Sequence, residues 1–232
     1  DPGPADETQL QNFLQAIGGA KLENILITHT HADHSPGALA LQEATGARLV
    51  GLKAPDVIGH DKTFAPDRLW CDEETIDCGE YSVQLIATPG HVSNHICFLL
   101  KQEQLLFTGD HVLQGTTSVI LPPDGDMTVY LNALERLLLI PLKALAPGHG
   151  TVMRQPHLEI EKLIAHRLKR EKKVVAGLES LGAVSLDELV LTVYDDVAKQ
   201  LIPWAKRTLL AHLLKLQQDE RVQYNNGLWE MR

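Results

Sequence analysis

Four side chains that can bind metal ions fall within six residues, directly after a short apolar run. Residues 25–27 predict a buried strand, and His29, His31, Asp33 and His34 follow it. Because alternate side chains of an extended chain share a face, His29 and His31 can address one ion. Asp33 and His34 come where the chain must turn, so they can address a second ion nearby. The alternative is a polar loop whose histidines are incidental.

The donors in this motif indicate a catalytic rather than a structural metal site. Imidazole nitrogens and carboxylate oxygens suit zinc, iron or manganese, and a catalytic site keeps one coordination position open for water. A structural zinc site would more often use pairs of cysteines, whereas Cys71, Cys78 and Cys97 all lie outside the motif. We therefore expect two divalent ions, with zinc as the first choice and iron or manganese as alternatives.

The cysteines and the apolar runs also bear on location. Three unpatterned cysteines suggest neither a disulfide framework nor a zinc ribbon, so a reducing compartment is the simpler interpretation. No signal peptide is visible, and no apolar run approaches the ~20 residues that a membrane helix needs. We expect a cytoplasmic protein without membrane contact, and the mitochondrial matrix is the alternative for a eukaryotic chain.

Charge is distributed unevenly over the 232 residues. Residues 1–150 hold 8 Lys and Arg against 19 Asp and Glu, a net charge of −11, whereas residues 151–232 hold 13 against 11, a net charge of +2. An acidic front and a mildly basic tail indicate two regions with different surfaces. Together with the element pattern, this predicts a catalytic domain over 1–155 and a small helical domain over 156–232.

Three more candidate ligands follow predicted strands further along the chain. His91, Asp110 and His149 each come shortly after such a strand and beside a glycine. Loops at strand ends are where a rigid scaffold can bring distant side chains together. A single histidine after a strand would be weak evidence for a site, but potential ligands after several strands predict a shared site. The strands concerned are expected at 81–87, 104–108 and 144–147.

The remaining pattern predicts helices around the front strands and a helical tail. In the front, helices are expected at about 7–17, 38–45 and 130–139, with further strands at 48–52 and 96–100. In the tail, Ser185 and Glu188 form the pattern of a capping box, and Asn226-Gly227 is a hairpin turn signal. The tail elements resemble a winged helix-turn-helix, with helices at 158–181, 185–194 and 203–218 and a hairpin at 222–230.

The order of these motifs resembles the metal-ligand set of the metallo-β-lactamase superfamily. The resemblance implies an α+β fold, a four-layer αβ/βα sandwich of two mixed sheets with helices outside and a dimetal site at one edge. It implies His29, His31 and His91 on one metal, Asp33, His34 and His149 on the other, and Asp110 bridging them. The segments that carry it are His29-Thr30-His31-Ala32-Asp33-His34, Pro89-Gly90-His91, Thr108-Gly109-Asp110 and Pro147-Gly148-His149-Gly150.

Two departures narrow this resemblance. The best-known zinc β-lactamases carry cysteine where this chain has Asp110, and a carboxylate there resembles glyoxalase II, RNA-processing nucleases and related hydrolases. Antibiotic hydrolysis is therefore not expected. In the superfamily, a run such as Asp1-Pro2-Gly3 normally follows several strands. The sequence is therefore expected to lack the first N-terminal strands of the sandwich.

The tail resembles that of the β-lactamase-like protein 2 type, which carries a winged helix and a helix like His166-Arg167-Leu168-Lys169-Arg170-Glu171. Members include single-strand endoribonucleases and thioesterases that release acyl chains from carrier proteins. The resemblance implies a hydrolase whose two metals share a hydroxide that attacks an ester or thioester, with Asp33 also accepting a proton from the water. Cleavage of single-stranded RNA is the alternative function, and a non-catalytic binding module is the alternative class.

Three groups outside the ligand set have open roles. His95 could touch substrate or orient a ligand from behind, or it could be a structural histidine at a strand end. The cations of the helix at 158–181 could contact phosphates, or they could form a solvated face with Arg167 and Glu171 paired four residues apart. His60 and His212 are expected to be surface or packing residues.

Overall fold

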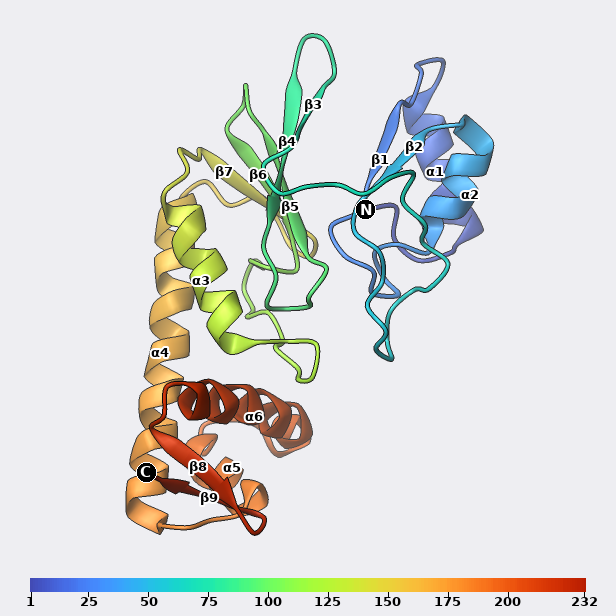
Figure 1. Ribbon diagram of the computed structural model, residues 1–232. Helices are drawn as coiled ribbons and strands as arrows, with labels where there is room; N and C mark the ends of the chain where they lie inside the picture. Colours follow the sequence, from blue (N-terminus) through green and yellow to red (C-terminus); the bar gives the residue numbers. More distant parts are fainter.

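The computed structural model describes residues 1–232, and the front of the chain forms four layers (Figure 1). Strands β1 (Asn24–Leu26) and β2 (Arg48–Val50) pair in parallel, with helices α1 (Glu7–Ile17) and α2 (Gly37–Thr45) packed against them. The first sheet thus holds two strands.

A five-stranded sheet forms the next layer. Its strands are β3 (Thr75–Asp77), β4 (Ser82–Ala87), β5 (Ile96–Leu100), β6 (Leu105–Gly109) and β7 (Ala144–Pro147). They pair in chain order, antiparallel except for the parallel pair β6–β7. Helices α3 (Met127–Leu138) and α4 (Pro156–Leu181) pack against the outer face, where Tyr130, Leu134 and Ile160 are fully buried. The expected αβ/βα sandwich is confirmed, except that the first sheet is a parallel pair and only the second sheet is mixed.

Helix caps account for two of the helix starts in the front of the chain. Asp6 accepts a hydrogen bond from the Gln9 amide at 2.8 Å, so α1 begins at Glu7 as predicted. Asp126 accepts from the Val129 amide at 2.9 Å in the same way. The predicted start at position 130 was wrong because this cap begins α3 three residues earlier, at Met127.

The tail has its own core, and α4 extends into it (Figure 1). The capping box is confirmed: the Glu188 amide donates to Ser185 Oγ, and the Ser185 amide donates to Glu188 Oε2, both at 3.3 Å. Val174 and Leu178 of α4 are buried among the other tail elements. These are α5 (Leu186–Val193), the 3₁₀ turn η1 (Lys199–Leu201), α6 (Ile202–Gln218) and the hairpin of β8 (Val222–Asn225) and β9 (Leu228–Met231). None of the helices combines the length and the apolar character needed to cross a bilayer.

His212 of α6 makes the stability of the fold sensitive to acid. It is fully buried, and neither ring nitrogen has a hydrogen-bond partner. Burial, reinforced by the charge of Arg167, lowers the pKa of His212 to about 3. The pKa of a histidine in an unfolded chain is ~6.5. At mildly acidic pH, this side chain is therefore protonated in the unfolded chain but stays neutral in the folded chain. The stabilisation is complete above about pH 6.5 and is lost progressively as the pH falls toward 3.

We expect His212→Leu to flatten this dependence. The fall in the free energy of unfolding between about pH 7 and pH 4.5 should be smaller in the variant by roughly 2–3 kcal/mol. Urea denaturation of both proteins at both pH values measures it. Equal falls in the two proteins would contradict the buried neutral imidazole.

Candidate metal centre

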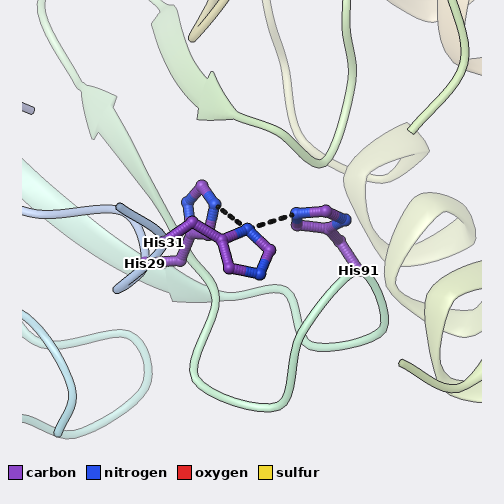
Figure 2. Close-up of side chains that lie close together, drawn as sticks. All are labelled: His29, His31 and His91. Atoms are coloured by element: carbon purple, nitrogen blue, oxygen red, sulfur yellow. Dashed lines mark hydrogen bonds between the residues drawn. The ribbon is translucent and has the colours of Figure 1, made fainter. Parts of the chain in front are cut away.

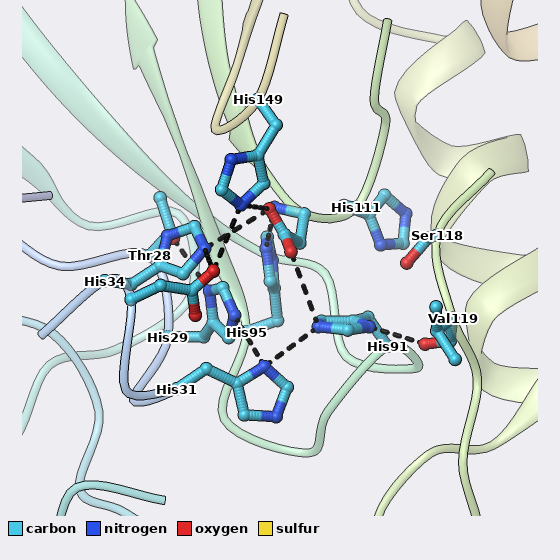
Figure 3. Close-up of polar contacts among 12 residues, drawn as sticks. Thr28, His29, His31, His34, His91, His95, His111, Ser118, Val119 and His149 are labelled. Carbon is cyan, nitrogen blue, oxygen red and sulfur yellow. Dashed lines mark hydrogen bonds and ion pairs between the residues drawn. The ribbon is translucent and has the colours of Figure 1, made fainter. Parts of the chain in front are cut away.

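Loops at the ends of four strands bring the seven predicted ligands together, and Figure 3 labels the histidines among them. His29 begins the motif after β1, and His91, Asp110 and His149 follow β4, β6 and β7. Potential donor atoms from the seven side chains form overlapping groups of three, each within 4.8 Å of one another. The structure therefore places every one of these residues at one edge of the sandwich.

Glycines beside the candidate ligands permit this close approach. Gly109 has a φ of +47°, and a Cβ at that position would stand 2.8 Å from His95 Nε2. A Cβ at Gly148 would stand 2.8 Å from Asp110 Oδ1. Larger residues at either position would push the ligand loops apart, which gives the glycines beside Asp110 and His149 a steric reason.

His29, His31 and His91 turn three ring nitrogens toward one point (Figure 2). His31 Nδ1 lies 3.0 Å from His29 Nε2 and 3.2 Å from His91 Nε2. His91 Nδ1 donates to the Val119 carbonyl at 2.6 Å. His29 Nδ1 lies 3.0 Å from Thr28 Oγ1, whose own proton is donated to a carboxylate. These bonds keep the ring protons of His29 and His91 on the outer nitrogens, so their inner nitrogens carry lone pairs.

Asp33, His34 and His149 form a second group beside the first. His149 Nε2 lies 3.2 Å from Asp33 Oδ2, and His34 Nε2 lies 3.7 Å from the same oxygen. The other nitrogen of His34, Nδ1, is bonded to Asp1 Oδ2 at 2.9 Å. This bond turns His34 Nε2 toward the group in the same manner as His91.

The carboxylate of Asp110 lies between the two groups. Its Oδ1 is 3.4 Å from His34 Nε2 and 3.6 Å from His149 Nε2, whereas its Oδ2 is 3.9 Å from His91 Nε2. One carboxylate thus faces donors of both groups.

Electrostatics favour neutral imidazoles at His29, His31 and His91 and a charged carboxylate at Asp110. Burial, with neighbouring histidines as a further cause, lowers the pKa of His29 well below its ordinary value and that of His31 to about 4. Burial alone would raise the pKa of Asp110, but His34, His91 and His149 together hold it below its ordinary value. Neutral imidazole and ionised carboxylate are the forms that bind metal ions, so the site needs little proton release on binding.

Two buried atoms in this centre have no hydrogen-bond partner. They are His34 Nε2 and Asp110 Oδ1, each almost inaccessible to solvent. Buried polar atoms without partners are costly, and nitrogen lone pairs directed at one another repel. A divalent cation would satisfy these atoms at once, because it accepts lone pairs from nitrogen and oxygen alike. The donor set therefore fits the metal ions that its chemistry suggests.

His95 lies behind the site rather than in it. Its ring is fully buried, Nδ1 lies 2.8 Å from Thr88 Oγ1, and Nε2 accepts a hydrogen bond from the Asp110 amide at 3.2 Å. Burial lowers the pKa of His95 well below its ordinary value, which preserves the neutral acceptor. Of the three roles open to His95, these contacts argue against touching substrate, and they agree with both orienting Asp110 and a structural role at the strand end.

His60 is a neighbour of the site that sequence reasoning did not place. Its ring lies 4.9 Å from that of His31, centroid to centroid. Its Nδ1 is 2.8 Å from Thr30 Oγ1, and its Nε2 is 3.1 Å from Asp124 Oδ2. His60 thus joins two loops beside His31 through packing, and no spacing in the sequence signals a contact between residues so far apart.

Arg167 of the basic helix fits neither of the two roles expected for the cations of that helix, which were phosphate contact and a solvated face. Arg167 is 3% exposed, so its charge belongs neither to a solvated face nor to a surface that phosphates could reach. The ion pair with Glu171 that belonged to the solvated-face alternative is absent, and Glu171 instead pairs with Lys215 at 3.1 Å and Arg221 at 3.6 Å. Tertiary partners compete here with a partner on the same helix.

Comparison with known proteins agrees with this geometry. Residues 1–149 match the family described as the metallo-beta-lactamase superfamily, and residues 185–229 match the beta-lactamase associated winged helix domain. An atrochrysone carboxyl ACP thioesterase from Aspergillus fumigatus is 28% identical over 95% of this chain and 71% of its own length. A beta-lactamase-like protein 2 homolog from Caenorhabditis elegans is 28% identical over 93% of this chain and 71% of its own length.

A solved structure extends the similarity to the whole chain. A metallo-beta-lactamase family protein from Thermus thermophilus superposes with a TM-score of 0.80 at 22% identity, covering 100% of this chain and 89% of that chain. The sandwich and the winged helix are thus shared as one arrangement. The chain belongs to the metallo-β-lactamase superfamily of metal-dependent hydrolases, with the associated winged helix at its end.

Proposed function

We propose that the protein is a dinuclear metal hydrolase that cleaves a thioester or ester. The observation that carries this proposal is the position of Asp110, whose two oxygens face two separate donor groups from one buried place. In this assignment His29, His31 and His91 hold one ion, Asp33, His34 and His149 hold the other, and Asp110 is shared. Zinc suits the nitrogen and oxygen donors, and iron or manganese would be accepted by the same set.

The residues of the chain supply positioning and proton transfer. Divalent ions held by these donors supply Lewis-acid activation of water and of the scissile carbonyl. We assign proton transfer to Asp33, whose side chain is 58% exposed at the open side of the site. Water adds to the carbonyl carbon and its proton passes to the Asp33 carboxylate. The carbon–sulfur bond then breaks, and the departing thiolate takes up the proton from Asp33.

Thioester cleavage is favoured over RNA cleavage by two observations. One similar protein is a thioesterase that acts on a carrier-bound substrate, as its name states. In addition, three cations of α4 are engaged within the protein, whereas Lys169 and Lys172 remain exposed without a partner. Arg167 binds the Ser118 carbonyl, and Arg170 and Lys173 pair with Asp196 and Asp195. A phosphate-binding surface would need such cations free.

A parallel assay tests the substrate class. Metal-loaded protein is offered an acyl-thioester and a single-stranded RNA, with and without chelator, beside the variant His31→Ala. We expect thioester hydrolysis that chelation abolishes and that His31→Ala lowers by more than ~100-fold, because even groups that only orient a ligand are worth ~10–100-fold. RNA cleavage without thioester hydrolysis would overturn the proposed substrate class, and no chelator-sensitive hydrolysis of either would overturn the enzyme assignment.

A further inference from the structure

The buried guanidinium of Arg167 makes no ion pair, although the cost of burying a charge is high. Arg167 lies in α4, and it reaches across to the loop that precedes α3. There it donates to the backbone carbonyl of Ser118. Its guanidinium carbon also stands 5.5 Å from the centre of the Tyr130 ring, a distance at which a cation is attracted by the ring face.

The residue that follows Ser118 contacts a candidate ligand directly. The carbonyl of Val119 accepts the bond from His91 Nδ1 at 2.6 Å, and Figure 3 shows Ser118 and Val119 beside the His91 ring. Adjacent carbonyls of one short segment are therefore held from two sides, by Arg167 and by His91. Ser118 is itself buried, so water cannot readily replace the guanidinium as its donor.

We propose that Arg167 is a positioning residue for His91, acting through the peptide of Ser118 and Val119. The charged hydrogen bond from Arg167 holds the backbone of Ser118 and Val119 in place. This position allows the Val119 carbonyl to accept the hydrogen bond from His91 Nδ1. That bond sets the angle of the His91 ring and leaves Nε2 free to face His31. Hydrogen bonds to a charged donor are stronger than neutral ones, which suits Arg167 to this task. The inference rests on the proposed function, since it assigns His91 to a metal.

Arg170 offers a matched control on the same helix. It lies about one turn further along α4 and donates to the Val193 carbonyl at 2.6 Å and to Asp196 at 2.8 Å. Its guanidinium carbon also stands 4.3 Å from the centre of the Tyr194 ring. Arg170 therefore ties α4 to the tail with a carbonyl contact and an aromatic contact like those of Arg167, together with an ion pair that Arg167 lacks.

The test compares Arg167→Met with Arg170→Met in two measurements that need no turnover. Chelator competition gives the metal dissociation constants, and the visible absorption of the Co²⁺-loaded protein reports ligand geometry. We expect Arg167→Met to weaken metal binding by about tenfold and to change the Co²⁺ spectrum, at the lower end of effects seen for groups that orient ligands. Arg170→Met should leave both within about twofold of wild type even if its Tm falls.

Two results would overturn the inference. One is a folded Arg167→Met protein with wild-type metal affinity and spectrum, and the other is an equal loss in both variants. If Arg167→Met does not fold, Arg167→Lys decides, because lysine keeps the charge but not the planar fork over Tyr130. We expect about threefold weaker binding there, and unchanged binding would again overturn the inference. A wild-type protein that bound no metal would instead overturn the proposed function.

Discussion

Replacing Asp110 with alanine should abolish hydrolysis while leaving the protein folded. Asp110 is the one carboxylate that faces both donor groups, so its loss removes a ligand from each proposed ion. We expect kcat/KM to fall by more than ~100-fold, because partners that merely orient metal ligands already cost ~10–100-fold. The side chain contributes no apolar packing to the core, so the circular dichroism spectrum should remain that of wild type.

Glu103→Ala is the matched control for this variant. Glu103 is an exposed carboxylate in the turn between β5 and β6, the strand that Asp110 follows, and it forms no hydrogen bond or ion pair. Its activity should equal that of wild type. Normal turnover in Asp110→Ala, or an equal loss in Glu103→Ala, would contradict the role assigned to Asp110.

Removing metal should lower the thermal stability substantially and reversibly. Without cations, the centre leaves His34 Nε2 and Asp110 Oδ1 buried without partners and directs the imidazole nitrogens at one another. A ligand that binds only the folded state at about 1,000 times its Kd stabilises by about 4 kcal/mol. For a chain of this size, that corresponds to a fall in Tm of about 10 °C on chelation.

Calorimetry of the metal-loaded, chelated and reloaded protein measures this effect. The Tm should fall on chelation and recover on reloading, whereas in Asp110→Ala the same treatments should move it much less. An unchanged Tm in the wild-type protein would mean that no cation stabilises the centre.

Much of the site could be predicted because its signals are local. A buried strand followed by alternating histidines fixes which side chains can share a face, and a glycine beside a ligand marks close backbone approach. Helix caps are local as well, and Ser185 with Glu188 predicted the start of α5 correctly. Such features depend on residues within a few positions of one another.

Other features depend on contacts that no local pattern encodes. The strand β3 was missed because only Ile76 of its three residues is buried, so no alternating run was visible. Arg167 and Ser118 are 49 positions apart, and His60 and Asp124 are 64 apart. No repeating pattern in the sequence predicts either contact. The division of the chain at 155/156 stays a prediction, since α4 contributes to the cores on both sides of it.

Elemental analysis of protein loaded with metal and then desalted measures whether the seven side chains hold two ions. We expect about two divalent ions per wild-type chain, the number that a shared carboxylate between two donor groups implies. We expect fewer in Asp110→Ala. A wild-type chain that retained one ion or none, or an Asp110→Ala chain that retained two, would contradict this expectation.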